Sequence, residues 1–125
     1  MDADEPRDAD SLDALLTERL GMIVRLVARP GGRAAVLDCL HRYCDRLDEE
    51  PGTEAFAINL DPDEADVVWL LEWFNGEQAM VAHRESAAFA DMTQELSGLL
   101  SQPPGLVRMD PLRVRLQGIL VESSL

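Results

Sequence analysis

The segment 67–74 (VVWLLEWF) constrains the fold more than any other part of this chain. Its β-branched and aromatic residues lie between the polar turn DPDEAD and the dipeptide NG, which is typical of a β-strand. Side chains alternate between the two faces of a strand, which separates two sets: Trp69, Leu71 and Trp73, and Val68, Leu70, Glu72 and Phe74. Both sets are mainly apolar, so both faces of this strand need to be covered.

The second face of this strand has no obvious cover within one subunit. A chain of 125 residues has little left for it once its helices have packed on the first face. A core of this size also gains stability from association. We therefore predict that a second subunit covers this face and that Trp69 and Trp73 pack against that subunit.

The hydrophobic pattern of the remaining chain predicts an alternation of strands and helices. Apolar alternation and helical periodicity predict strands at 22–29, 54–60, 67–74 and 106–109, and helices at 33–50, 77–86 and 87–100. This order is the split β-α-β-β-α-β arrangement of ferredoxin-like α+β domains, with an antiparallel sheet and helices on one face. The main domain is expected to span residues 21–111.

The two ends of the chain are expected to differ from this domain. Residues 1–20 are expected to form an acidic tail followed by a short amphipathic helix from 11 to 20, because leucines recur there at helical spacing. Residues 112–125 are expected to form a C-terminal strand or arm. The alternation in 112–116 (LRVRL) predicts a strand that adds to a sheet edge and crosses to the other subunit, with further apolar surface from 119–121. The alternative is a frayed tail.

Composition excludes several classes of function. The chain has 24 acidic and 11 basic residues and a net charge of −13, which disfavours nucleic acid as a partner. It has no apolar run of the roughly 20 residues needed to cross a membrane. The acidic N-terminus is unlike a signal peptide, so we expect a cytoplasmic protein.

Five short motifs occur in a fixed order along the chain: PG at 30–31, EPG at 50–52, EWF at 72–74, AMVAH at 79–83 and SAAF at 86–89. The set is similar to the pattern of the antibiotic biosynthesis monooxygenase family, with Phe74 where that pattern has Trp. The resemblance covers about residues 20–111. It implies ferredoxin-like monomers that pair through their sheets into a homodimer, a dimeric α+β barrel.

Glu72 and His83 are the candidate catalytic residues. Glu72 is the one charged residue of an apolar strand, and burial of a carboxylate is costly and raises its pKa. The resemblance places His83 on a helix that faces the same pocket, where it could hold or pass a proton. The alternatives are a structural carboxylate that anchors a backbone group or an Arg, and a core histidine with satisfied hydrogen bonds.

Four apolar residues are candidates for substrate binding: Leu70, Phe74, Met80 and Phe89. Core packing is the alternative for the last three. Anthrone-oxygenating members of the family carry Asn, Trp and Tyr at the first three of these positions, so their polar contacts to substrate are missing here. Haem-degrading members use an Asn in the first strand and a Trp at position 74. Neither is present, and haem breakdown is not expected.

The resemblance implies a monooxygenase that oxidises a quinol or a polycyclic phenol of polyketide type with O₂. It implies no cofactor, since such members use neither flavin, haem nor metal, and the partners are then a small aromatic molecule and O₂. The alternative is a non-catalytic dimer that binds a small hydrophobic ligand or a partner protein.

The spacing Cys39-x-His41-x-x-Cys44 suggests a metal site, but helix geometry argues against it. At 3.6 residues per turn the two cysteines lie about 140° apart around the helix, and His41 belongs to the polar face. We therefore expect two reduced, structural thiols and no metal site.

Overall fold

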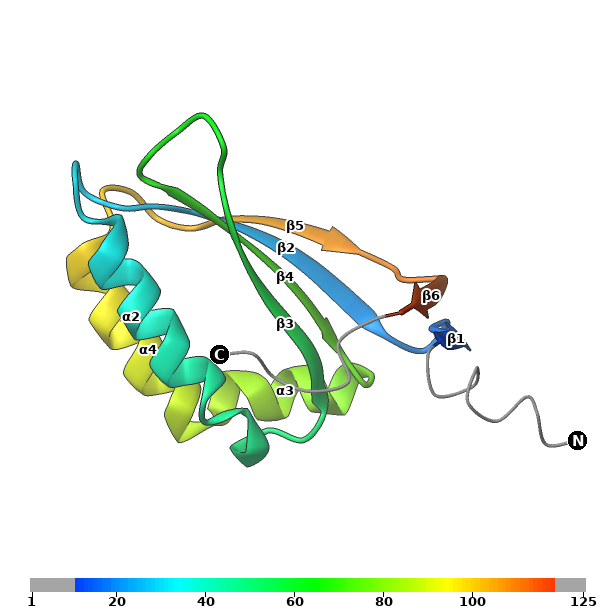
Figure 1. Cartoon of the computed structure of the whole chain (residues 1–125). Helices are drawn as coiled ribbons and strands as arrows, with labels where there is room; N and C mark the ends of the chain where they lie inside the picture. The colour runs from blue at the N-terminus through cyan, green and yellow to red at the C-terminus, as the bar shows by residue number, and fades with distance from the viewer. Residues whose placement is uncertain (1–10, 119–125) are drawn as a thin grey trace, which may run out of the picture.

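A computed structural model describes residues 11–118, and its centre is one antiparallel sheet of four strands (Figure 1). The strand order is β3-β4-β2-β5, with β2 at Leu20–Val27, β3 at Thr53–Leu60, β4 at Val67–Phe74 and β5 at Gly105–Met109. The central position of β4 agrees with its two apolar faces. All pairs of neighbouring strands are antiparallel.

Three α-helices lie on one face of this sheet (Figure 1). They are α2 at Arg33–Cys44, α3 at Glu77–Glu85 and α4 at Ala87–Leu99. The first is shorter than predicted, because the chain leaves α2 at Cys44 and forms a 3-10 turn, η2, at Leu47–Glu49. The element order is therefore the predicted α+β, ferredoxin-like arrangement, which is confirmed.

The hydrophobic core lies between the sheet and the helices. Val68 and Leu70 of β4 pack there against Leu40 of α2 and Met92 of α4. The predicted alternation along β4 is confirmed, because the set that begins at Val68 is buried whereas Leu71 on the other face is 37% exposed.

The outer face of the sheet carries an apolar row across all four strands. The pairing register aligns Val107 of β5, Ile23 of β2, Leu71 of β4 and Ala57 of β3. Paired residues of neighbouring strands share a face. No helix within residues 11–118 lies on this face (Figure 1), and Val107 is 58% exposed.

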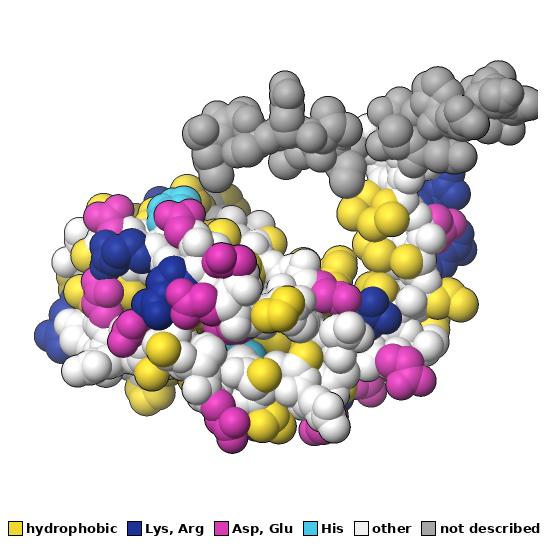
Figure 2. Space-filling view, turned by 90° about the horizontal axis from the view of Figure 1, so that it is seen from below, with side chains coloured by type: hydrophobic (Ala, Val, Ile, Leu, Met, Phe, Trp, Pro, Cys, Tyr) yellow, Lys and Arg dark blue, Asp and Glu magenta, His cyan; other side chains and the backbone are white. Residues whose placement is uncertain are grey.

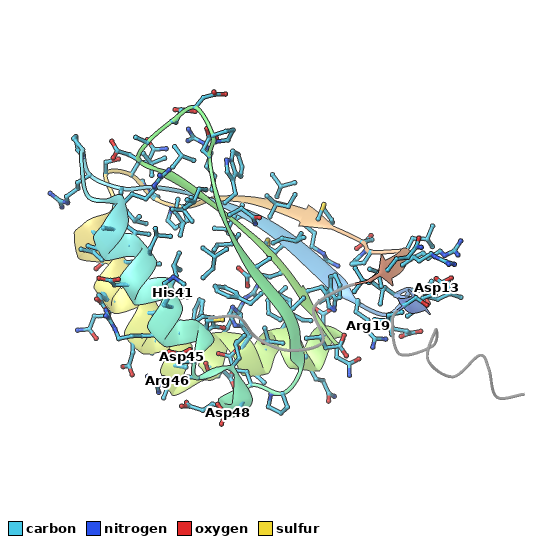
Figure 3. All side chains as sticks on the ribbon, in the orientation of Figure 1. Asp13, Arg19, His41, Asp45, Arg46 and Asp48 are labelled. Carbon is cyan, nitrogen blue, oxygen red and sulfur yellow. The ribbon has the colours of Figure 1, made fainter. Side chains whose placement is uncertain are left out.

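The expected helix at 11–20 is wrong. Residues Ser11–Leu15 form a strand, β1, which pairs antiparallel with β6 at Arg113–Gln117 in a separate two-stranded sheet. The leucine spacing suits either element, but an isolated helix of ten residues is marginal in water. Pairing supplies hydrogen bonds between the two strands and an ion pair of 2.7 Å between Asp13 (Figure 3) and Arg113.

The C-terminal strand forms as expected, but its pairing differs from the expectation. It pairs with β1 in a separate two-stranded sheet instead of extending the four-stranded sheet. The expected crossing to a second subunit stays a prediction. One face of the ribbon is apolar, since Leu12 lies opposite Leu116 and Ala14 opposite Val114. Figure 2 shows this ribbon as an arm beside a hollow, with hydrophobic side chains toward the hollow and charged ones away from it. The acidic tail at 1–10 and the apolar residues 119–121 lie outside the described residues.

Between residues 11 and 118, none of the helices combines the length and the apolar character needed to cross a membrane.

Candidate functional site

A cavity of about 250 Å³ lies between the inner face of the sheet and helices α3 and α4. Its wall is mainly apolar, with four polar side chains: Glu72, His83, Arg84 and Thr93. The six candidate residues from the sequence all line this one cavity: Leu70, Glu72, Phe74, Met80, His83 and Phe89. The structure therefore brings together residues that the sequence distributes over β4, α3 and α4.

Two local features aim these side chains inward. Along β4, Leu70, Glu72 and Phe74 are alternate residues, so all three lie on the inner face. At the end of the strand Gly76 adopts a φ of 96°, a conformation that favours glycine, and begins α3. Met80 and His83 are three residues apart on α3, so they share its buried face.

Glu72 is a buried carboxyl group without a local partner. It is 6% exposed, and none of the residues from 11 to 118 forms a hydrogen bond with its side chain. Burial, and to a lesser extent the negative charge of Glu50, raises its pKa to about 7. At neutral pH this group is therefore able both to hold and to release a proton.

His83 is also 6% exposed, and its hydrogen-bonded carboxylate is Glu50. Its Nδ1 atom lies 2.8 Å from Oε1 of Glu50 and 2.9 Å from the hydroxyl oxygen of Tyr43. The ring packs between two aromatic side chains, with centroid distances of 4.8 Å to Phe74 and 4.4 Å to Phe89. Glu72 and His83 face the same cavity as expected, and the carboxylate that is hydrogen-bonded to His83 is Glu50.

Glu50 is the centre of a buried hydrogen-bond network. It is 3% exposed and accepts hydrogen bonds from the hydroxyl groups of Tyr43 at 2.9 Å, Thr53 at 2.8 Å and Ser86 at 2.8 Å. Burial alone would raise the pKa of Glu50, but the hydrogen bonds, above all that of His83, outweigh it and lower this pKa. Glu50 is therefore ionised at neutral pH.

The network also determines the state of Tyr43. Burial, with a further contribution from the negative charge of Glu50, raises the pKa of Tyr43. The phenol therefore stays protonated and acts as a hydrogen-bond donor to Glu50.

Close packing holds Glu50 against α3. A Cβ atom at Gly52 would come within 2.5 Å of the Ala79 side chain, so glycine is required where the chain enters β3. This contact places the 50–52 segment beside the helix that carries His83.

The cysteine and histidine side chains of α2 point in different directions. Cys39 is buried and His41 is exposed (Figure 3), and Cys39 and Cys44 are both free thiols. Among residues 11–118, no three His, Cys, Asp or Glu side chains are grouped as a metal site requires.

Residues 19–95 match the model of the antibiotic biosynthesis monooxygenase family. This stretch contains β2, β3, β4, α2 and α3, and it contributes both candidate catalytic residues and the Glu50 network. The chain belongs to this family. No curated protein matches its sequence.

Solved structures share the fold of this family member. A Caulobacter crescentus protein, provisionally assigned as an antibiotic biosynthesis monooxygenase, gives a TM-score of 0.71 at 16% identity over 77% of this chain and 92% of its own. A Nitrosomonas europaea protein with the same provisional assignment gives 0.71 at 18% identity, over 78% and 93%. Rv0793 of Mycobacterium tuberculosis gives 0.69 at 22% identity, over 75% and 95%. At these identities the likeness establishes the fold.

Sequence reasoning missed Glu50, Tyr43, Thr53 and Ser86 as members of the site. Glu50 and Ser86 belong to the EPG and SAAF motifs that carry the family resemblance, but Glu50 was interpreted as the end of the helix predicted at 33–50 and Ser86 only as a motif position. Two sequence features could have identified Glu50 and Tyr43. Glu50 is an acidic residue directly before Pro-Gly, and it lies seven residues after Tyr43, the chain's single tyrosine, which is on the apolar face of α2.

Proposed function

We propose that this family member is a cofactor-independent monooxygenase that oxidises a quinol or a polycyclic phenol with O₂. The observation that carries the proposal is the apolar cavity that Glu72 and His83 both face. Leu70, Phe74 and Phe89 supply walls suited to an aromatic ring, and an enclosed apolar site strengthens the electrostatic effect of each polar group inside it.

The proposed reaction needs a proton acceptor and an apolar site. Glu72 or His83 removes a proton from a substrate hydroxyl group, and the electron-rich anion reduces O₂ directly. One oxygen atom enters the ring, the other leaves as water, and the substrate supplies all four electrons. No external reductant is needed for this balance.

Oxygen uptake with a panel of hydroquinones and polycyclic phenols tests this function. At least one compound should be consumed faster with protein than in buffer. The variant that removes the proton acceptor, Glu72→Gln or His83→Ala, should lower that rate by about 100-fold, since general acid–base groups typically contribute this much. Val81→Ala, an exposed change on α3, should leave the rate unchanged.

Two outcomes would contradict the proposed monooxygenase function. One is that no compound is oxidised faster than in buffer, and the other is that both variants match the wild type. Saturable binding of a panel compound without oxygen uptake would instead favour a non-catalytic protein that binds a small hydrophobic ligand.

We also propose that the protein is a homodimer joined through the outer faces of its sheets. The apolar row that includes Leu71 and Val107 supports this, together with Trp69 and Trp73 on the same face of β4. An apolar face that crosses a whole sheet is typical of an interaction surface.

The variant Leu71→Asp should be monomeric where the wild type is dimeric, because it would place an unpaired charge in the apolar interface. Light scattering at micromolar concentration measures this. Val81→Asp adds the same charge to an exposed apolar position on the helical layer and should stay dimeric. A monomeric wild type would contradict the proposal.

A further inference from the structure

Both hydrogen-bond neighbours of Nδ1 of His83 are acceptors. Glu50 is ionised, and a carboxylate can only accept hydrogen bonds. The hydroxyl group of Tyr43 donates its hydrogen to Oε1 of Glu50 at 2.9 Å, so toward Nδ1 its oxygen can only accept. Nδ1 must therefore carry a proton to satisfy the contacts of 2.8 and 2.9 Å.

The other ring nitrogen is consequently left as the basic atom. A neutral imidazole with its proton on Nδ1 carries a lone pair on Nε2. His83 lines the cavity, while its Nδ1 edge is occupied by Glu50 and Tyr43.

We propose that Glu50 is a positioning residue that holds His83 in the Nδ1–H tautomer and thereby makes Nε2 of His83 the atom that accepts the substrate proton. This inference rests on the proposed function and divides the roles of the two candidate residues. The O–H bond of the substrate breaks, an N–H bond forms at Nε2, and the products are a phenolate and an imidazolium. The negative charge of Glu50 stabilises that imidazolium, as the carboxylate of a catalytic triad does.

Glu72 then acts in its protonated form. A carboxyl group on the same cavity wall can donate a hydrogen bond to the phenolate oxygen. An ionised Glu72 would repel that oxygen, so the division of roles uses both acids: Glu50 charged behind the imidazole, and Glu72 neutral beside the substrate.

The tautomer can be measured directly by long-range ¹H–¹⁵N NMR of the histidine side chains. The chain has two histidines, and His41 is exposed on α2, so the buried ring is readily assigned. The neutral ring of His83 in the wild type should show a protonated Nδ1 and an unprotonated Nε2. A wild-type His83 protonated mainly on Nε2 overturns the inference, whatever any variant does.

Glu50→Gln tests the role of the carboxylate. The amide can donate to Nδ1, so the fraction of the Nε2–H tautomer should rise at least severalfold. Glu54→Gln is the matched control, because that exposed acid pairs with Arg19 (Figure 3) and is not among the hydrogen-bond partners of the imidazole. Tyr43→Phe keeps the carboxylate and should retain the Nδ1–H tautomer, which gives a second variant if Glu50→Gln does not fold. Loss of that tautomer in Tyr43→Phe would overturn the role of Glu50.

Kinetics separates this inference from the function on which it rests. With any oxidised quinol, Glu50→Gln should lower kcat at least tenfold and leave KM within about twofold. Oxygen uptake that is lost in His83→Ala but unchanged in Glu50→Gln overturns the positioning role and leaves the proposed function standing. If NMR shows the Nδ1–H tautomer but no quinol is oxidised, the result supports the positioning of His83 by Glu50 and contradicts the proposed oxygenase function.

Discussion

Replacing Phe74 with alanine is expected to lower the free energy of unfolding by about 3–5 kcal/mol. Phe74 is almost completely buried at the end of β4, where it packs with Leu20 and Met80 and against the His83 ring. Truncation removes a large apolar side chain from water-excluded packing and leaves a cavity next to an existing one, so the site has little means of collapsing.

Urea unfolding at a fixed protein concentration measures this loss, because the midpoint of the proposed dimer would depend on concentration. Leu15→Ala is the control, since Leu15 is 69% exposed on β1 and its truncation should cost well under 1 kcal/mol. A loss below about 1 kcal/mol for Phe74→Ala would mean that the packing around His83 is looser than the structure indicates.

The second large effect is a dependence of stability on pH that comes from Glu72. Its folded-state pKa of about 7 lies above its ordinary value of 4.5. Between these values the folded protein retains a proton that the unfolded chain releases, so stability falls as pH rises. Below pH 4.5 burial of Glu72 causes no such loss. Above pH 7 it lowers the free energy of unfolding by the full amount, about 3 kcal/mol.

Glu72→Gln removes this titration. Relative to the wild type, the variant should be more stable by up to about 3 kcal/mol at pH 8 and nearly equal at pH 4. The comparison cancels the opposite contribution of Glu50, whose lowered pKa acts in both proteins. Urea unfolding from pH 4 to pH 8 checks the result, with Glu77→Gln on the exposed face of α3 as control. A difference that does not change with pH would contradict the burial of a titrating carboxyl.

Glu72→Gln should therefore raise stability at neutral pH and lower the proposed oxygenase activity. Such a loss of stability is expected for a catalytic residue whose chemistry requires burial. Stabilisation without loss of activity would assign Glu72 a purely structural role.

The local sequence determined the secondary-structure elements that have a short repeat of apolar residues, either the alternation of a strand or the spacing of a helix. The alternation within 67–74 defined β4 and both of its faces, since neighbouring residues of a strand point in opposite directions whatever surrounds them. It also identified Glu72 as a carboxyl that folding would bury. The spacing of Met80 and His83 placed both on one face of a helix in the same way.

Only the tertiary structure decided features that join distant parts of the chain. Residues 11–15 became a strand because 113–117, about a hundred positions later, supply its hydrogen bonds; the leucine spacing alone also suits a helix. The partner of His83 is Glu50, 33 residues away, rather than the nearer candidate Glu72. A sequence shows which side chains will be buried, but the hydrogen bonds that a buried group makes depend on which segments meet, and here the contact of 50–52 with α3 decided it.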